Sequence, residues 1–287
     1  MSDVRPFNWS VRRELWENRF LYLAPLVVSA FVLLGTFISV VALAHRLRTM
    51  RAMDAVQWHK TVVTPFSMAP APILFTTFLV GMFYSLDALY GERRDRSILF
   101  WKSLPVSDRT TVLSKAAIPL VMLPLIGMAI GLVVQFILLM LSAPIFAGHG
   151  MSPATALGEF RFFQEPIVMV YGLTVHSLWM APIYAWLLFV SAWAKRMPVL
   201  WATLPLVAIG ILERLALGTT HFAALVKYRF MGAMHEAFVP QNAVMIDRLA
   251  DLDPVRFLTA PGLWTGLIAA AAFLAAAVRL RRNHEPI

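Results

Sequence analysis

Residues 21–44 read LYLAPLVVSAFVLLGTFISVVALA, an apolar run of 24 residues without a charged side chain. An α-helix rises about 1.5 Å per residue, so roughly 20 apolar residues are enough to cross the hydrocarbon core of a bilayer. This run is therefore predicted to be a membrane-spanning helix. It is too long for the apolar core of a signal peptide, and no clear small-residue cleavage site follows it, so we expect it to be retained.

Five further apolar runs follow, and together they predict an all-α polytopic membrane protein with six transmembrane helices in one transmembrane domain, residues 1–287. The predicted spans are residues 21–44, 73–90, 116–141, 167–194, 198–212 and 262–278. Hydrophobic residues make up 59% of the chain and charged residues 14%. Because soluble domains are roughly half apolar and a quarter charged, one large soluble core is excluded.

Two segments outside the spans also carry helical patterns. Residues 1–20 hold four arginines among aromatic and aliphatic residues, which predicts an interfacial helix lying on the membrane surface. Apolar residues recur at helical spacing within residues 213–261, which predicts short outer helices before the sixth span.

The net charge of +9 is interpreted as a topology signal, because the basic residues flank the apolar runs instead of lining one solvated face. No nucleic-acid partner is expected. With the N-terminus inside, the predicted cytoplasmic segments hold 15 Lys and Arg residues and the outer segments hold 10. Both termini are therefore predicted to be cytoplasmic.

Composition and spacing also argue against a chemical centre in this chain. The chain contains no cysteine, which excludes disulfides, thiolate metal sites and a cysteine nucleophile. Its seven histidines show no pair at helical ligand spacing, and its carboxylates are not paired inside the predicted spans. We expect no metal site, no catalytic residues and no enzymatic activity.

The coupling loop, residues 91–115, GERRDRSILFWKSLPVSDRTTVLSK, separates the second and third predicted spans. The segment begins with charges, becomes apolar and aromatic, and then has a proline before a Ser-Asp pair suited to cap a helix. We expect a helix, a turn and a second helix. The apolar middle part needs a cover, which is either the groove of a soluble motor with charged residues as its rim, or the lipid interface, where Trp is common.

The motifs of this segment resemble the signature of ATP-binding-cassette (ABC) type-2 permeases. The matching positions are Glu92-Arg93, Ser97, Leu104-Pro105-Val106-Ser107, Arg109 and Lys115. The sequence departs from the family pattern at four places: Arg96 stands for the usual glycine, Ser97 for threonine, Asp108 is inserted, and Ser114 replaces glycine. The order of surface helix, six spans and long final outer loop is similar to the family over nearly the whole chain.

The resemblance implies that residues 92–104 form a coupling helix resting on a separate ATPase subunit. The implied coupling residues are Glu92, Arg93, Arg94, Arg96, Ser97, Leu99, Phe100, Trp101, Lys102, Leu104 and Pro105. It also implies two cytosolic ATPase copies and a second permease copy, as a homodimer in the lipid bilayer. The chain has no Gly-x-x-x-x-Gly-Lys-Ser/Thr loop, so ATP and Mg²⁺ are expected on the ATPase and no cofactor on this chain.

Three polar residues inside or near the spans are candidates for a transport pathway or for structural pairing. Asp87 lies near the end of the second span and is interpreted mainly as a partner of Arg93 or Arg94. Gln135 and His176 lie well inside spans three and four, where a polar group needs a partner on a neighbouring helix or a wet cavity.

The resemblance implies a subunit of a bacterial inner-membrane exporter whose cargo is hydrophobic, amphipathic or peptide-like. Two alternatives stay open at this point. One is a mechanotransmission subunit that acts on outer-face proteins through residues 213–261. The other is an intramembrane lipid-modifying enzyme, which would need a cluster of catalytic groups that the sequence does not display.

Overall fold

The computed structural model describes residues 4–47, 68–97, 106–147, 164–239 and 249–283, and these residues are nearly all helical. Within them no β-sheet forms, only an isolated bridge between Phe238 and Leu252. The elements are α1 (Val4–Glu17), α2 (Phe20–Leu47), α5 (Pro70–Asp87), α6 (Tyr90–Arg94), α8 (Asp108–Ala117), η2 (Ile118–Met122), α9 (Leu123–Ala147), α11 (Gln164–Trp193), α12 (Pro198–Leu217), α13 (His221–Ala237), η3 (Leu249–Asp251), α14 (Pro254–Thr259) and α15 (Pro261–Asn283).

Six helical stretches of the described residues are long and apolar enough to cross a membrane, which confirms the predicted number of spans. They are Phe20–Ala42, Pro70–Arg94, Asp108–Ala143, Pro166–Trp193, Pro198–Leu217 and Pro261–Asn283. The chain is therefore treated as a membrane protein with six spans.

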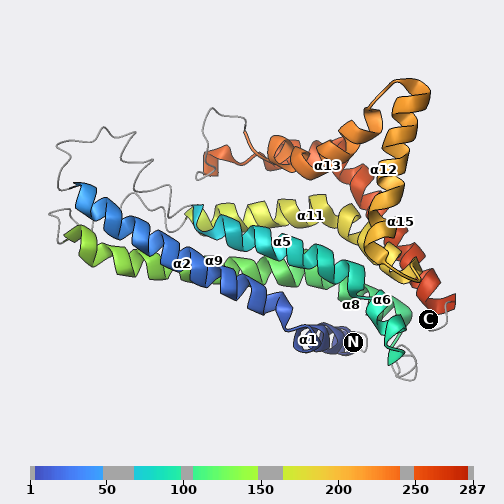
Figure 1. Ribbon diagram of the computed structural model, residues 1–287, viewed down its shortest axis with the longest axis horizontal. Helices are drawn as coiled ribbons and strands as arrows, with labels where there is room; N and C mark the ends of the chain where they lie inside the picture. Colours follow the sequence, from blue (N-terminus) through green and yellow to red (C-terminus); the bar gives the residue numbers. More distant parts are fainter. Residues whose placement is uncertain (1–3, 48–67, 98–105, 148–163, 240–248, 284–287) are drawn as a thin grey trace.

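Helices α2, α5, α9 and α11 lie side by side in an elongated bundle (Figure 1). Helix α11 joins this bundle to the C-terminal part of the chain, because it packs against α5 and α9 of the bundle and also against α15. The side chains of Trp179 and Tyr184 on α11 are completely or almost completely buried. Helix α12 leaves this bundle and exposes most of its apolar side chains, as a helix surrounded by lipid does.

Near prolines, the boundaries of two spans differ from the predicted ones. Helix α5 begins at Pro70, three residues before the predicted start, because proline is tolerated in the first turn, where backbone N–H groups have no helical partner. Pro119 lies in η2, a π-helical turn that joins α8 to α9. Residues 108–147 thus form one continuous helix, so the predicted third span, residues 116–141, continues the helix that begins at Asp108.

Two spans extend beyond their predicted ends because the charged side chains near those ends find hydrogen-bond or ion-pair partners. Helix α12 continues to Leu217, since the Glu213 carboxylate accepts hydrogen bonds from Thr219 Oγ1 at 2.7 Å and from two backbone N–H groups of the first turn of α13. Helix α15 continues to Asn283 and carries Arg281 into a buried ion-pair network. Helices α13 and α14 occupy the stretch in which short helices were predicted.

Candidate functional site

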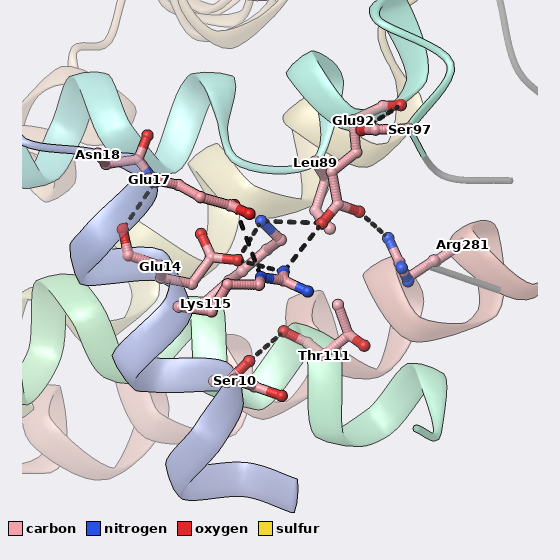
Figure 2. Close-up of polar contacts among 12 residues, drawn as sticks. Ser10, Glu14, Glu17, Asn18, Leu89, Glu92, Ser97, Thr111, Lys115 and Arg281 are labelled. Atoms are coloured by element: carbon pink, nitrogen blue, oxygen red, sulfur yellow. Dashed lines mark hydrogen bonds and ion pairs between the residues drawn. The ribbon is translucent and has the colours of Figure 1, made fainter. Parts of the chain in front are cut away.

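Charged side chains from four helices meet at the end of the bundle where α6 lies (Figure 2). We call this cluster the charge hub. Its members are Arg13 and Glu14 from α1, Glu92 from α6, Asp108 and Lys115 from α8, and Arg281 from α15. Three of these residues are cationic and three are anionic, so the charge hub is formally neutral.

Lys115 occupies the middle of the charge hub. Its Nζ atom lies 2.9 Å from Glu14 Oε1 and 3.1 Å from Glu92 Oε1, and its side chain is 4% exposed. The hydroxyl of Tyr84 on α5 donates a hydrogen bond to the other oxygen of Glu14 at 2.7 Å. An ammonium group so deeply buried needs such partners, because taking a lone charge out of water costs several kcal/mol.

Arg281 and Arg13 complete the charge hub from opposite sides. The guanidinium of Arg281 bonds to Glu92 and also donates from Nε to Asp108 Oδ1 at 3.1 Å. Arg13 Nη2 lies 2.7 Å from Glu14 Oε1 and 3.6 Å from Glu92 Oε1. Glu92 is thereby linked to α1, α8 and α15 at once.

Local sequence explains how these side chains are aimed at one another. Glu14 lies on the same face of α1 as the buried residues Ser10 and Val11, four and three positions earlier. The Ser107 side chain accepts a hydrogen bond from Thr110 N at 3.1 Å, which confirms the predicted cap of α8. Lys115 follows two turns later and faces inward.

The environment of Glu14 favours its charged form. Burial raises the pKa of this carboxyl group, but the charge of Lys115 and the hydrogen bonds from Lys115, Tyr84 and Arg13 outweigh burial and lower the pKa to about 2. Glu14 is therefore a carboxylate over the whole physiological pH range.

Glu14 should make stability depend on pH in the acid range. Since its pKa is lowered from 4.5 to about 2, its contribution is complete above about pH 4.5 and is lost as pH falls towards 2. The apparent melting temperature (Tm) of Glu14→Gln in detergent should lie below that of the wild type at pH 7. This difference should shrink as the pH is lowered below about 4.5, and a difference that stays constant would contradict the ion-pair assignment.

A second anchor fixes α6 to the C-terminal end of α11. Ser191 Oγ accepts hydrogen bonds from Leu89 N at 3.0 Å and Tyr90 N at 2.9 Å. Arg93 Nη2 donates to the carbonyl oxygens of Ser191 at 2.8 Å and Ala194 at 2.6 Å. Carbonyls at a helix C-terminus lack helical partners and carry partial negative charge, so a guanidinium suits them.

The four charged residues at the start of the predicted coupling helix do not share one environment. Glu92 and Arg93 are buried inside the chain, so the expectation that they belong to an exposed charged rim is wrong. Arg94 and Arg96 are exposed. Arg94 Nη1 lies 3.9 Å from Asp87 Oδ1, which agrees with the interpretation of Asp87 as a pairing residue.

The remaining predicted site residues are placed as follows. Ser97 is half-buried, and its Oγ donates to Glu92 O at 3.4 Å. His176 Nε2 lies 3.4 Å from Tyr184 OH, and its ring meets Phe78 edge-on, so it packs inside the bundle and is not part of the charge hub. Gln135 is half-buried on α9. The residues outside the described part of the chain are Leu99, Phe100, Trp101, Lys102, Leu104 and Pro105.

A cavity of about 290 Å³ lies beside the charge hub, between α1, α5 and α6. Its walls carry the carboxylates of Glu14, Glu17, Asp87, Glu92 and Asp95. In the described ranges no group of three or more His, Asp or Glu side chains is arranged to hold a metal ion. The charges of the hub neutralise one another, so the arrangement is suited to holding the four helices together.

No family model, no curated protein and no solved structure matches this chain. The charge hub therefore has to be interpreted from its own geometry and from the sequence motifs around it. Sequence reasoning missed Arg13, Glu14 and Arg281 as members of the charge hub, and Tyr84 as the hydrogen-bond donor to Glu14. The available signal was Glu14 itself, a carboxylate on the apolar face of an amphipathic helix.

Arg96 adopts a left-handed backbone conformation, with φ 55°. This conformation costs a residue with a Cβ atom about 1–2 kcal/mol, whereas glycine adopts it freely. Arg96→Gly should therefore stabilise the chain by about 0.5–1 kcal/mol, after glycine's greater loss of backbone entropy is counted. Arg94→Gly, in the helical conformation of α6, is the matched control and should lower the Tm. A lower Tm for Arg96→Gly would show that this backbone strain is absent.

Proposed function

We propose that this chain is the membrane subunit of an ATP-driven exporter, related to the ABC type-2 permeases. The observation that carries the proposal is the anchoring of residues 95–107, the segment with the family-like motifs. Glu92 and Arg93 hold its start, and Asp108 and Lys115 hold its end. All four anchors are ion pairs or hydrogen bonds to other helices.

This anchoring suits a segment that transmits force. A displacement of residues 95–107 would act on α1 and α15 through the charge hub and on α11 through Arg93. Removing one partner of a buried ion pair costs about 3–5 kcal/mol, so these helices would move together before the pairs separate. To open a transport path, an ATPase at this end of the bundle would need to move several spans together.

The backbone at Arg96 gives independent support. The family pattern has glycine at this position, and here the residue takes the left-handed conformation that favours glycine. The backbone after α6 thus takes a conformation that favours glycine, although the side chain here is arginine.

The proposal assigns ATP and Mg²⁺ to two copies of a cytosolic ATPase, and it places this chain as a homodimer in the bacterial inner membrane. The end with the charge hub and both termini would face the cytoplasm. The cargo would be hydrophobic, amphipathic or peptide-like, as the family resemblance implies. No ATP is hydrolysed by this chain itself, because its sequence has no phosphate-binding loop.

Co-expression with an ATP-binding-cassette ATPase from the same genome tests the proposal. Phe100→Ala and Trp101→Ala should weaken assembly by about thirtyfold or more, the effect of losing an aromatic anchor worth about 2 kcal/mol at an interface. Co-purification and ATPase stimulation in nanodiscs are the measurements. Trp264→Ala, an exposed tryptophan at the start of α15, is the control. Unchanged assembly and stimulation in both test variants would refute the coupling role.

A further inference from the structure

Helix α1 has a second face that the charge hub does not use. Trp9, Arg12 and Trp16 recur at intervals of three and four residues on the side opposite to Glu14. Trp9 is 62% exposed and Trp16 is 60% exposed. Large aromatic side chains left uncovered in this way on a helix beside a membrane span need a partner with both apolar and polar character.

The guanidinium of Arg12 lies between the two indoles. Its Cζ atom is 4.6 Å from the ring centroid of Trp16 and 5.7 Å from that of Trp9, both within cation–π range. A guanidinium that contacts rings through its flat faces keeps its N–H donors free in its own plane. These donors match the two oxygens of a phosphate group.

Arg12 has no carboxylate partner among the described residues, and the same is true of Arg19 two residues after the end of α1. The neighbouring Arg13, in contrast, faces inward and lies within ion-pair distance of Glu14, Glu17 and Glu92. The exposed face of α1 therefore carries positive charge that no carboxylate of the described residues neutralises.

The short link between α1 and the first span fixes how deep α1 lies relative to that span. Helix α1 ends at Glu17 and the span begins at Phe20, whose exposed side chain is followed by exposed Leu23 and Leu26. The exposed face of α1 thus lies close to where the apolar surface of the protein begins. In a bilayer this is the depth of the phosphate groups, where Trp and Arg are both favoured.

We propose that Trp9, Arg12 and Trp16 form a binding site for the phosphate group of an anionic phospholipid, with Arg19 adding charge at its edge. The indoles contact the glycerol and upper acyl region, and the Arg12 N–H groups bind the phosphate oxygens. The site does not depend on the exporter function, because it uses none of the residues that anchor residues 95–107.

Native mass spectrometry of the purified full chain in detergent tests this site. Phosphatidylglycerol is titrated against phosphatidylcholine with the same acyl chains. Phosphatidylglycerol should bind more tightly to the wild type, and Arg12→Gln should weaken its binding by about fivefold, the contribution of one cation near an anionic membrane surface. Trp9→Ala combined with Trp16→Ala should also weaken it. The Tm of Arg12→Gln should stay unchanged, because this side chain is exposed.

Two matched controls separate this site from general attraction to charge. Arg196→Gln removes an exposed cation at the same end of the bundle, and Trp264→Ala removes an exposed tryptophan elsewhere. Both variants should bind phosphatidylglycerol as the wild type does. Glycerol 3-phosphate should not compete. Equal binding by Arg12→Gln and the wild type, or displacement of the lipid by glycerol 3-phosphate, would overturn the proposal. Loss of self-association instead of lipid binding in Arg12→Gln would assign the face to a second copy.

Discussion

Lys115→Met should lower the free energy of unfolding by about 3–5 kcal/mol, the cost of removing one partner from a buried ion pair. The substitution preserves the length of the side chain but leaves Glu14 and Glu92 facing each other without the ammonium between them. For a domain of this size the loss corresponds to a fall in apparent Tm of about 10 °C. Thermal unfolding in detergent, followed by tryptophan fluorescence, measures it.

A paired substitution distinguishes charge from packing. Adding Glu14→Gln to Lys115→Met removes one carboxylate together with the ammonium, so the double variant should be more stable than Lys115→Met alone. Lys195→Met, at an exposed position at the same end, should change stability by no more than about 0.5 kcal/mol. If Lys115→Met changed the stability no more than Lys195→Met does, Lys115 would not be the central ion-pair partner of the charge hub.

Arg281→Leu should have the second largest effect, about 3 kcal/mol, because it leaves the buried carboxylate of Glu92 without its closest cation and frees Asp108. It also removes the ion pairs that join the last span to α6 and α8, while the apolar contacts of α15 with Leu89 and Val112 remain. Arg282→Leu is the matched control, since the next residue of the same helix is exposed. Its Tm should remain near that of the wild type.

The same variant should separate assembly from transmission. If the proposed exporter function is correct, Arg281→Leu should still bind the ATPase, because residues 95–107 are intact, but stimulation of ATP hydrolysis by cargo should fall. Reconstituted nanodiscs with both subunits provide the measurement. Stimulation equal to that of the wild type, in a variant shown to be folded at the assay temperature, would mean that α15 does not take part in transmission.

The six spans could be predicted from the sequence because each depends on a local property, a run of apolar residues long enough to cross a bilayer. Their ends were less predictable. Glu213 and Arg281 were expected to lie beyond the helices, yet both are within them, because each finds partners supplied by the fold. The cap at Ser107 was predictable, since its donor is only three residues away.

The charge hub could not be predicted because its pairs join residues far apart in the chain. Lys115 and Glu14 are 101 residues apart, and Arg281 and Glu92 are 189 residues apart. Residue type alone made Arg93 and Glu92 appear to be surface charges of a loop. Only the fold shows that α6 lies against α11 and buries them, whereas the neighbouring Arg94, Asp95 and Arg96 stay exposed.

The side of the membrane on which residues 95–107 lie tests the account most directly. Because the chain has no cysteine, Ser103→Cys introduces a unique label site, and Ser152→Cys marks the predicted outer loop between α9 and α11. With a membrane-impermeant maleimide, Ser103→Cys should react only in inverted vesicles and Ser152→Cys only in intact cells or spheroplasts. Labelling of Ser103→Cys from outside would place this segment beyond the reach of any cytosolic ATPase and contradict the proposed function.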